Sequence, residues 1–341
     1  MFQTNEKIYI FGTTLISSIV YKFIAEMGLK VNGYICDFSS AAHFQGEKVF
    51  SRDDMEAQND AFTVINCSLT NFKSISQYYQ KNELIRHISF YELARNFPTL
   101  LNQIEFFDDL TNQISNSEEK YIQYSSMFED ERSRYAWLSI FEARKSLSFD
   151  KQDFEFDTNQ YFPDFIHLTS NEVMIDAGSN RGDTVDSFIS RTGGKFKKIH
   201  IFEPQQYCIE KCMERFYRYK NIEYHPKVLS SECGTVTFLD DFGSGCKIST
   251  SGRDYPTVSI DHAVQDEVTF LKIDVEGAEL AVLNGAKQII KINKPKIAVC
   301  VYHKQQHFIE IPELLMEFRS DYKIYFRHHS PGIFESVMYF V

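Results

Sequence analysis

The stretch Asp176-Ala177-Gly178-Ser179-Asn180-Arg181-Gly182-Asp183-Thr184 joins an apolar strand to a helical pattern, and it decides the fold class. The run Glu172–Asp176 predicts the strand, and Thr184–Ser190 predicts the start of the helix. Glycine is used at such a turn because the backbone must approach a ligand closely, which a Cβ atom would prevent. The spacing is G-x-x-x-G, which differs from the G-x-G-x-x-G of pyrophosphate-binding turns. The stretch therefore predicts a ligand-binding strand-turn-helix unit.

The elements that follow this turn alternate between strands and helices. Strands are predicted at Lys198–Phe202, Ile222–His225, Thr235–Leu239, Thr269–Ile273 and Lys296–Tyr302, and helices at Gln205–Tyr217, Ala278–Ile290 and Ile311–Phe318. The last two predicted strands, Lys323–Phe326 and Ser336–Val341, form an antiparallel pair. Alternating β and α elements closed by a hairpin describe a doubly wound sheet.

A second α/β pattern precedes this one. Strands are predicted at Lys7–Phe11, Val31–Ile35 and Phe62–Asn66, and a helix carries the apolar residues from Ile16 to Met27 inward. This βαβ order implies a parallel sheet. We expect an α/β protein with two domains: a smaller Rossmann-like domain at 1–96 and the doubly wound domain at 170–341. The polar, aromatic and mostly helical segment 97–169 is expected to be a connector or lid.

Composition narrows the class of protein. The chain has 341 residues, of which 43% are hydrophobic, and its formal net charge is −11. A net negative protein repels phosphate backbones, so we expect no nucleic-acid partner. The seven cysteines are scattered without a C-x-x-C pair, which favours reduced thiols. The polar N-terminus and the lack of an apolar run of bilayer length favour a cytoplasmic protein without a membrane span.

Acidic residues stand where two further predicted strands end. Glu203 follows the strand Lys198–Phe202, at the place where folds of this kind keep an acid for ribose hydroxyls. Asp274 ends the strand Thr269–Ile273, and Glu276 and Glu279 follow it. A surface role for Glu203, and for the two glutamates a role in complementing the dipole of the next helix, are the simpler alternatives.

These stretches resemble the FkbM family of S-adenosylmethionine (SAM)-dependent methyltransferases. The matching segments are Val173–Thr184, Phe202–Pro204, Thr257–Asp261, Leu271–Gly285, Pro295–Lys304, Tyr325–Ser330 and Glu335–Tyr339, with Asp130–Arg134 and Gln160–Phe162 upstream. The run Lys-Ile-Asp-Val-Glu-Gly-Ala-Glu-Leu from Lys272 is the most distinctive. The resemblance implies a class I methyltransferase fold, SAM as cofactor, and methylation of a hydroxyl on a sugar, glycan precursor, polyketide or related small molecule.

The resemblance also implies roles for particular residues. The cofactor would be bound by Asp176, Gly178, Asn180, Gly182, Asp183, Thr184, Glu203 and Asp274. The carboxylate of Asp176 would help to hold the ammonium end of SAM, directly or through water; a helix N-cap is the simpler alternative for this residue. Asp274, Glu276 and His303 would line the reaction side.

Transfer to a hydroxyl requires a group that accepts the proton. His303 is the first choice because imidazole titrates near neutral pH, and His328 and His329 are alternatives. A divalent metal held by Asp274, Glu276, His303 and Glu335 is a further option, because these residues offer oxygen and imidazole ligands. The spacing of these residues contains no compact metal-binding motif, so the question of whether a metal ion binds stays open.

The N-terminal pattern leaves other functions open. Gly12 and Asp37 stand where a nucleotide-binding βαβ unit keeps its turn glycine and ribose acid, but two of the three expected glycines are absent. The domain resembles small Rossmann-like domains that bind nucleotide sugars or CoA-type ligands in sugar-modifying enzymes, and a structural or homo-oligomerisation role is an equal alternative. The competing hypotheses for the whole chain are a nucleotide-dependent oxidoreductase or sugar-modifying enzyme, and a non-catalytic binding protein that retains the fold.

Overall fold

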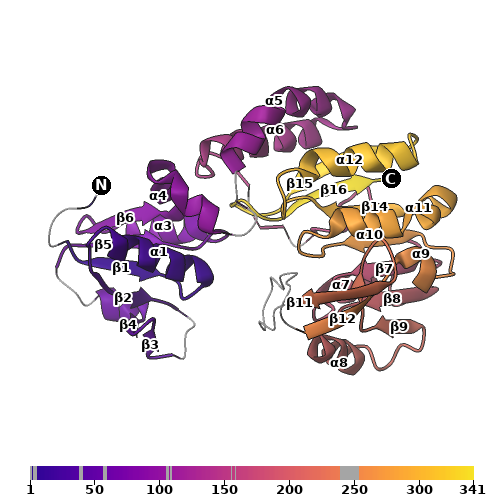
Figure 1. Ribbon diagram of the computed structural model, residues 1–341. Helices are drawn as coiled ribbons and strands as arrows, with labels where there is room; N and C mark the ends of the chain where they lie inside the picture. Colours follow the sequence, from indigo (N-terminus) through magenta and orange to yellow (C-terminus); the bar gives the residue numbers. More distant parts are fainter. Residues whose placement is uncertain are drawn as a thin grey trace. The chain divides into compact units, whose positions relative to one another are not determined.

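A computed structural model gives the fold, and it describes residues 2, 6–37, 41–56, 60–104, 107, 110–154, 156–157, 159–238 and 253–341. The chain divides into two compact units (Figure 1). The N-terminal unit comprises Met1–Glu118, Leu138–Phe156 and His329–Phe334, and the C-terminal unit comprises Glu119–Trp137, Asp157–His328 and Glu335–Val341. Both units are therefore discontinuous in sequence.

The N-terminal unit is built on a six-stranded sheet of order β3-β4-β2-β1-β5-β6, in which only β3 runs antiparallel to its neighbour. Its strands are β1 (Ile8–Phe11), β2 (Val31–Ile35), β3 (His43–Phe44), β4 (Glu47–Phe50), β5 (Phe62–Asn66) and β6 (Ile85–Ser89). Its helices are α1 (Leu15–Glu26), α2 (Arg52–Glu56), α3 (Phe72–Tyr79), α4 (Phe90–Asn96) and the 3₁₀ helix η1 (Pro98–Gln103). The predicted parallel sheet is confirmed.

Further helices follow η1 along the chain. They are α5 (Leu110–Tyr124), the 3₁₀ helix η2 (Ser125–Met127) and α6 (Glu131–Ser146). The predicted helical character of this segment is confirmed. The division between the units falls within α5 and α6, so neither helix belongs wholly to one unit.

The C-terminal unit is built on a seven-stranded sheet of order β15-β16-β14-β13-β7-β8-β9. The strands are β7 (Val173–Ala177), β8 (Lys198–Phe202), β9 (Ile222–His225), β13 (Phe270–Ile273), β14 (Lys296–Cys300), β15 (Ile324–His328) and β16 (Ser336–Phe340). The strand β16 runs antiparallel to both β14 and β15, and the other neighbouring pairs of this sheet are parallel. The predicted doubly wound sheet that ends in an antiparallel pair is confirmed.

The helices of this unit connect the parallel strands. They are α7 (Asp183–Arg191), α8 (Gln206–Arg215), α9 (Ile260–Ala263), α10 (Glu279–Gly285), α11 (Lys287–Asn293) and α12 (His307–Phe318). From the centre of the sheet the chain moves toward β9 through α7 and α8, and in the opposite direction through α10, α11 and α12. Because such crossovers are right-handed, these two sets of helices cover opposite faces of the sheet. All five residues of β7 are consequently buried.

One sequence expectation is wrong in detail. The helix predicted over Ala278–Ile290 is two helices, because the chain breaks after Gly285, where a Cβ atom would lie 2.2 Å from the carbonyl oxygen of Ser230. The strand predicted at Thr235–Leu239 is present as β11 (Gly234–Phe238). It pairs with β12 (Arg253–Val258) in a separate sheet that also contains β10 (Val228–Leu229). The predicted last residue, Leu239, lies outside the described residues.

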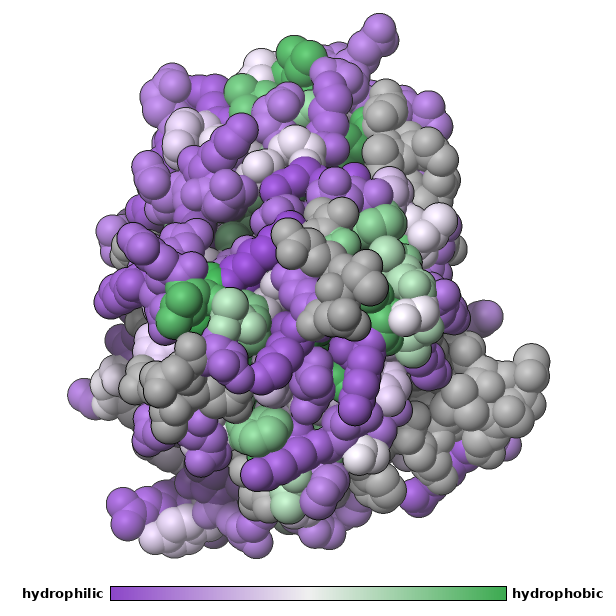
Figure 2. Space-filling view, turned by 90° about the vertical axis from the view of Figure 1, so that its left-hand side faces the viewer, coloured by the Kyte–Doolittle hydropathy of each residue, from purple (hydrophilic) through white to green (hydrophobic). Residues whose placement is uncertain are grey.

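The face drawn in Figure 2 is predominantly hydrophilic, with small, separate hydrophobic patches. Large exposed hydrophobic side chains such as Leu15, Leu84 and Ile292 come from different parts of the chain. Within the described ranges, no helix combines the length and the apolar character that crossing a membrane requires.

Candidate functional site

Four neighbouring parallel strands of the C-terminal unit end at the same edge of the sheet. Their order is β14-β13-β7-β8. Gly178 follows β7, Glu203 follows β8, Asp274 follows β13, and His303 lies three residues beyond β14. Because ligands of doubly wound sheets bind at the carboxyl ends of the strands, this edge is the candidate site.

The turn after β7 needs its two glycines. Gly178 has a φ of +83°, and a Cβ atom there would lie 1.8 Å from the carbonyl oxygen of Asp274. Gly182 has a φ of +85°, and its Cβ atom would lie 2.5 Å from the ring of Phe216. Between them, Asn180 also has a positive φ, of +47°. The G-x-x-x-G spacing therefore reflects two close approaches within the protein itself, which fix the shape of the turn.

Asp176 lies beneath this turn and is fully buried. Its Oδ1 atom lies 3.1 Å from Nζ of Lys272, and that ammonium also donates a hydrogen bond of 2.6 Å to the carbonyl oxygen of Gly178. Burial lowers the pKa of Lys272, but the Asp176 and Asp274 carboxylates outweigh it and raise the pKa overall. Asp176 thus fixes the turn through a buried ion pair, and its predicted contact with a cofactor stays a prediction.

Glu203 is held in a fixed orientation by backbone amides. Its Oε2 atom accepts a hydrogen bond of 2.9 Å from the backbone N–H of Asn180, and its Oε1 atom accepts one of 2.9 Å from Gln205. Burial raises the pKa of this carboxyl group, although the two backbone donors oppose the shift. The first hydrogen bond joins the end of β8 to the turn after β7, so the structure brings these two predicted parts of the site together.

The two residues at the start of α7 are more exposed. Asp183 is exposed, and its Oδ1 atom forms an ion pair of 2.6 Å with Arg215. Thr184 is half-buried in the first turn of the helix. Their predicted roles in binding a cofactor stay predictions.

His303 lies among carboxylates and is almost completely buried. Its Nδ1 atom lies 2.8 Å from Oε1 of Glu279, and its Nε2 atom lies 3.3 Å from Oε2 of Glu276 and 3.6 Å from Oδ1 of Asp274. The structure thus brings the three predicted reaction-side residues together. Burial lowers the pKa of His303, but Glu276, Glu279 and Asp274 together raise it to about 10. The ring is therefore an imidazolium cation at neutral pH.

Glu279 is the buried partner that fixes this ring. It is fully buried, its Oε1 atom accepts hydrogen bonds of 3.2 Å from the backbone N–H groups of Val275 and Gly277, and its Oε2 atom lies 2.9 Å from Nδ1 of His307. Burial raises its pKa, but the hydrogen bonds from His303 and His307 hold the pKa well below its usual range. Its place in the first turn of α10, which suggested a dipole partner, also makes it the residue that orients His303.

Asp274 accepts hydrogen bonds from two tyrosines. The hydroxyl of Tyr161 donates to Oδ2 at 2.9 Å, and that of Tyr302 donates to Oδ1 at 3.4 Å. Glu335 is a further acid near this group, and its Oε2 atom accepts a hydrogen bond from Gln160. Burial and the negative charge of Asp274 raise the pKa of Glu335 to about 7. Glu335 therefore changes charge near neutral pH, whereas His303 does not.

The two alternative histidines have other surroundings. His328 is buried on β15, and its Nδ1 atom lies 2.8 Å from the hydroxyl of Ser336. His329 is buried and belongs to the N-terminal unit. Of the three candidate histidines, His303 is therefore the one that the described contacts connect to Asp274 and Glu276.

The metal option is only partly supported by this geometry. Asp274, Glu279 and His303 each offer a ligand atom within 4.8 Å of the others. However, the two ring nitrogens of His303 face different carboxylates, Nδ1 toward Glu279 and Nε2 toward Asp274 and Glu276. One ion cannot use both nitrogens, so a divalent metal at Asp274, Glu276, His303 and Glu335 stays a prediction.

In the N-terminal unit, the two residues that suggested a nucleotide site form contacts within the protein itself. Gly12 has a φ of +105°, and its N–H donates a hydrogen bond of 2.8 Å to Ile35. The carboxylate of Asp37 forms an ion pair of 2.5 Å with Arg52. The acid that a nucleotide ribose would need is thus already paired with a cation.

Comparison with known proteins agrees with this geometry. Residues 176–324 match the family model of the methyltransferase FkbM domain. This part of the chain is a methyltransferase FkbM domain. The resemblance to this family implies SAM as the cofactor, and the chain is a SAM-dependent methyltransferase. No curated protein matches the sequence.

The likeness to a solved FkbM structure extends beyond the FkbM domain. The crystal structure of methyltransferase FkbM from Methylobacillus flagellatus KT has a TM-score of 0.79 at 21% identity, covering 98% of this chain and 90% of that chain. At this identity the likeness shows the fold alone. Fibrillarin from Aeropyrum pernix, with natively bound S-adenosyl-L-methionine, has a TM-score of 0.32 at 15% identity, covering 52% of this chain and 70% of that chain.

The chemistry of the FkbM domain's edge fits SAM. A carboxylate has about four lone-pair sites, and Glu203 uses two of them for backbone amides, so acceptors remain for ribose hydroxyls. Glu276 and Asp274 place negative charge at the same edge, which favours a ligand that carries a sulfonium and an ammonium group.

The sequence analysis did not identify several residues of the site. Lys272 is the charged residue of an otherwise apolar strand, and a charge at such a position requires a partner, which turned out to be Asp176. Tyr161 and Gln160 lie more than 100 residues before the acids that they contact. The resemblance covers Gln160–Phe162, but nothing in the local pattern indicates which acid each side chain meets.

Proposed function

We propose that this chain transfers the methyl group of SAM to a hydroxyl of an uncharged sugar, glycan precursor or related small molecule. The observation that carries the proposal is the group of Asp274, Glu276 and His303 at the strand ends, beside the glycine turn. This group combines proton acceptors with a fixed cation, which suits a reaction that must orient a hydroxyl and remove its proton.

Bound SAM supplies an electrophilic methyl group on a sulfonium. The protein's part would begin with binding: Glu203 accepts hydrogen bonds from the ribose, and the backbone of the turn Gly178–Gly182 contacts the adenosine and amino-acid parts. Asp183, Thr184 and Asp274 complete the proposed cofactor set. Asp176 would act through Lys272 and the turn, because the carboxylate is buried in an ion pair beneath it.

The proton of the acceptor hydroxyl would go to a carboxylate. The pKa of His303 is raised to about 10, so its ring already carries a proton at neutral pH and is a poor acceptor. Glu335, with a pKa of about 7, is ionised in a large fraction of molecules at that pH and is the better proton acceptor. His303 would then position Asp274 and Glu276 and balance their charge.

The charge of the site also limits the acceptor. Asp274, Glu276 and Glu335 would repel a phosphate or carboxylate placed among them. Carboxylates and the hydroxyls of Tyr161 and Tyr302 are suitable partners for the hydroxyls of a neutral sugar. We therefore expect neutral polyhydroxyl acceptors to be methylated, and sugar phosphates whose phosphate would lie among these acids to remain unmethylated.

A transfer assay with isotopically labelled SAM tests the proposal. The full chain would be offered neutral glycosides, amino sugars, sugar phosphates and simple phenols, and the product would be examined by NMR. The proposal predicts an O–CH₃ group on a neutral sugar acceptor, and at least a hundredfold slower transfer by Asp274→Asn. Methylation of nitrogen or carbon in the preferred acceptor would contradict it, as would equal rates for the variant and the unchanged chain.

The competing nucleotide function has a simple discriminating test. A thermal-shift comparison of SAM with NAD would separate the two hypotheses, because a ligand that binds the folded state raises the unfolding temperature. We expect a shift with SAM. The pairing of Asp37 with Arg52 gives no support to a dinucleotide at the N-terminal unit.

A further inference from the structure

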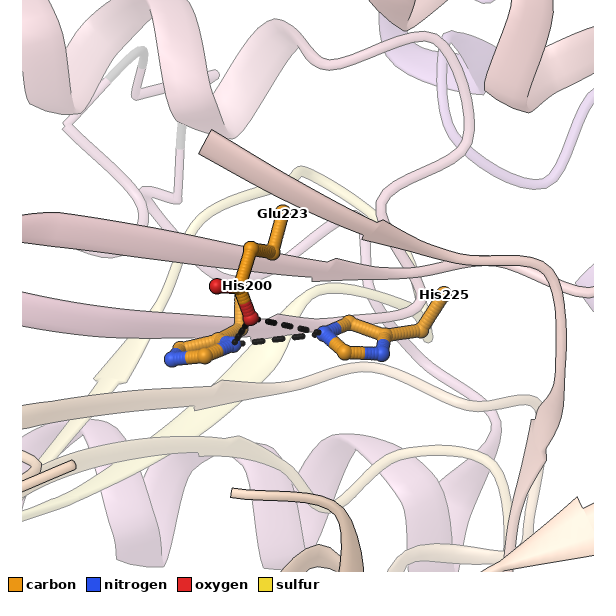
Figure 3. A group of neighbouring side chains, drawn as sticks. All are labelled: His200, Glu223 and His225. Atoms are coloured by element: carbon orange, nitrogen blue, oxygen red, sulfur yellow. Dashed lines mark hydrogen bonds and ion pairs between the residues drawn. The ribbon is translucent and has the colours of Figure 1, made fainter. Parts of the chain in front are cut away.

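A second cluster of metal-binding side chains lies on the sheet of the C-terminal unit, apart from the residues assigned above. His200 lies in the middle of β8, and Glu223 and His225 lie on the neighbouring strand β9. The register pairs His200 with Glu223 and Phe202 with His225, so all of these side chains share one face of the sheet. Figure 3 shows the two imidazoles and the carboxylate converging on one point.

The distances among the three ligand atoms fit a tetrahedral metal site. Nδ1 of His200 lies 3.2 Å from Nε2 of His225 and 3.3 Å from Oε2 of Glu223, and Nε2 of His225 lies 4.0 Å from that oxygen. In a tetrahedral zinc site with bonds of about 2.0–2.1 Å, neighbouring ligand atoms lie about 3.3 Å apart. Two of the three separations are already close to this value. The third, between His225 and Glu223, is longer, and the exposed side chain of Glu223 can move to shorten it.

The residues around the cluster orient its ligands. Nε2 of His200 lies 3.0 Å from Oδ2 of Asp266, so this carboxylate favours the tautomer with hydrogen on Nε2 and a free lone pair on Nδ1. A carboxylate behind a histidine is the usual support of a metal-binding imidazole. Lys198 binds Oε1 of Glu223 at 2.6 Å and Oδ2 of Asp266 at 2.9 Å, which leaves Oε2 of Glu223 for an ion.

The charges allow a divalent cation despite the lysine. Lys198 is balanced by Asp266, so Glu223 remains as a net negative charge beside two imidazoles. His200 is buried but Glu223 is half-exposed, which gives an ion a route from solvent. The simpler alternative is that the imidazole of His225 donates a hydrogen bond to that of His200 and no ion binds.

We propose that His200, Glu223 and His225 bind one divalent transition-metal ion of the zinc type, with Asp266 as a positioning residue and a solvent molecule as fourth ligand. Imidazole and carboxylate ligands suit zinc, cobalt and nickel, and three protein ligands leave one position open.

This site differs from the proposed methyl-transfer site in its place on the sheet. Lys198 is the first residue of β8 and Asp266 precedes β13, so the cluster extends toward the amino ends of these strands. The methyl-transfer residues lie beyond the carboxyl ends. One backbone contact connects the two, because the N–H of Glu203 donates to the carbonyl of His225 at 3.2 Å. The ion would join the edge strand β9 to β8 beside Glu203, which is a structural role.

Metal titration of the full chain tests the proposal. The protein would be stripped with a chelator and titrated with Zn²⁺ by calorimetry and with Co²⁺ by visible absorption, which reports tetrahedral coordination. We expect one ion per chain at this site and a higher unfolding temperature with Zn²⁺. His225→Gln and Glu223→Gln should weaken binding at least tenfold, and Asp266→Asn should weaken it by about 10- to 100-fold.

Two control variants locate the ion. His262→Gln alters an exposed histidine elsewhere in the unit, and His303→Gln alters the other candidate cluster; both should bind Zn²⁺ as the unchanged chain does. Circular dichroism would verify folding, and Glu223→Gln is the safer variant because its side chain is half-exposed. The proposal is overturned if the chain binds neither ion at micromolar concentrations. It is also overturned if His225→Gln and Glu223→Gln bind as tightly as the unchanged chain, or if binding is lost only in His303→Gln.

Discussion

At the scale of single residues, the charge of His303 is the feature that most changes the sequence-based account. A histidine after a strand suggests a general base. Its raised pKa, caused by Glu276, Glu279 and Asp274 in spite of burial, makes it a permanent cation near neutral pH. This outcome depends on the arrangement of three acids from two elements, which the spacing of the residues alone does not give.

The raised pKa predicts a pH-dependent stability. The folded pKa of His303, about 10, lies above its ordinary value of 6.5. Its stabilisation is therefore complete below about pH 6.5 and is lost as the pH rises toward 10, by up to about 1.4 kcal/mol per pH unit. His303→Gln should remove this slope from urea unfolding measured between pH 6.5 and 9, and should cost about 3–5 kcal/mol at pH 6.5, because the buried Glu279 loses its charged partner. His262→Gln is the control; an unchanged slope in His303→Gln would show that the ring is not charged.

The proposed role of Glu335 predicts a change in the pH–rate profile. Its pKa of about 7 should appear as an acidic limb of kcat/KM, because the carboxylate form accepts the proton. Glu335→Gln should lower kcat by about 10²–10⁴-fold and abolish this limb. Glu214→Gln, at an exposed position on α8, should leave both unchanged. An acidic limb that persists in Glu335→Gln would assign the proton acceptor to another group.

The buried pair of Asp176 and Lys272 predicts a large effect on stability. Both side chains are at most 3% exposed, so removing one charge leaves the other unpaired in the core. Lys272→Met should lower the free energy of unfolding by about 3–5 kcal/mol. Lys211→Met, which breaks an exposed pair with Glu214, should change it by less than about 1 kcal/mol. Similar effects of both variants, measured by urea unfolding, would disprove the structural role of the buried pair.

At the scale of elements, sequence patterns gave the β7–α7 turn and the strand ends correctly because they depend on local rules. Apolar runs predict buried parallel strands, and glycines with positive φ predict the turn. The break after Gly285 and the separate sheet around β11 could not be predicted, because both depend on where β10 and β12 lie in space. Likewise Glu203 was predicted at the site, but its hydrogen bond to Asn180 appears only once two elements meet.

The turn after β7 predicts a sharp difference between two glycine substitutions. Gly178→Ala places a Cβ atom 1.8 Å from the carbonyl oxygen of Asp274, whereas Gly193→Ala, also at positive φ, places one where no atom lies within 4 Å. Each substitution costs about 1 kcal/mol of folding stability, because alanine disfavours a positive φ. Gly178→Ala should therefore weaken SAM binding at least tenfold, and Gly193→Ala should leave it unchanged. Calorimetry of both variants, after folding is verified, provides the check. Equal affinities of the two variants for SAM would show that the turn is not part of the cofactor site.

At the scale of the whole molecule, the two α/β units have a similar order of strands and helices but different predicted functions. The C-terminal unit contains the FkbM domain and the group around His303. The N-terminal unit contains a six-stranded, mostly parallel sheet, and Asp37, which follows β2, is paired with Arg52. The domain limits 1–96, 97–169 and 170–341 stay a prediction, as do a homo-oligomer and a ligand of the N-terminal unit. Sequence order alone could not indicate that His329–Phe334 belongs with the first unit.

Hydrogen exchange would assign the cofactor to one unit. S-adenosylhomocysteine, the demethylated product of SAM, should slow amide exchange in the turn 178–184 and around Glu203, because these backbone groups become covered or fixed. Amides of the turn after β1, from Gly12 to Thr14, should keep their rates. Protection centred on that turn would instead favour the nucleotide function of the N-terminal unit.

The central claim is that the glycine turn after β7 and Glu203 after β8 form the binding site for SAM. Calorimetric titration of the full chain with S-adenosylhomocysteine, supported by equilibrium dialysis, tests it most directly. The account predicts one molecule bound per chain and at least tenfold weaker binding by Glu203→Gln, because the ribose then loses a charged acceptor. No binding of either S-adenosylhomocysteine or SAM, or an affinity unchanged by Glu203→Gln, would contradict it.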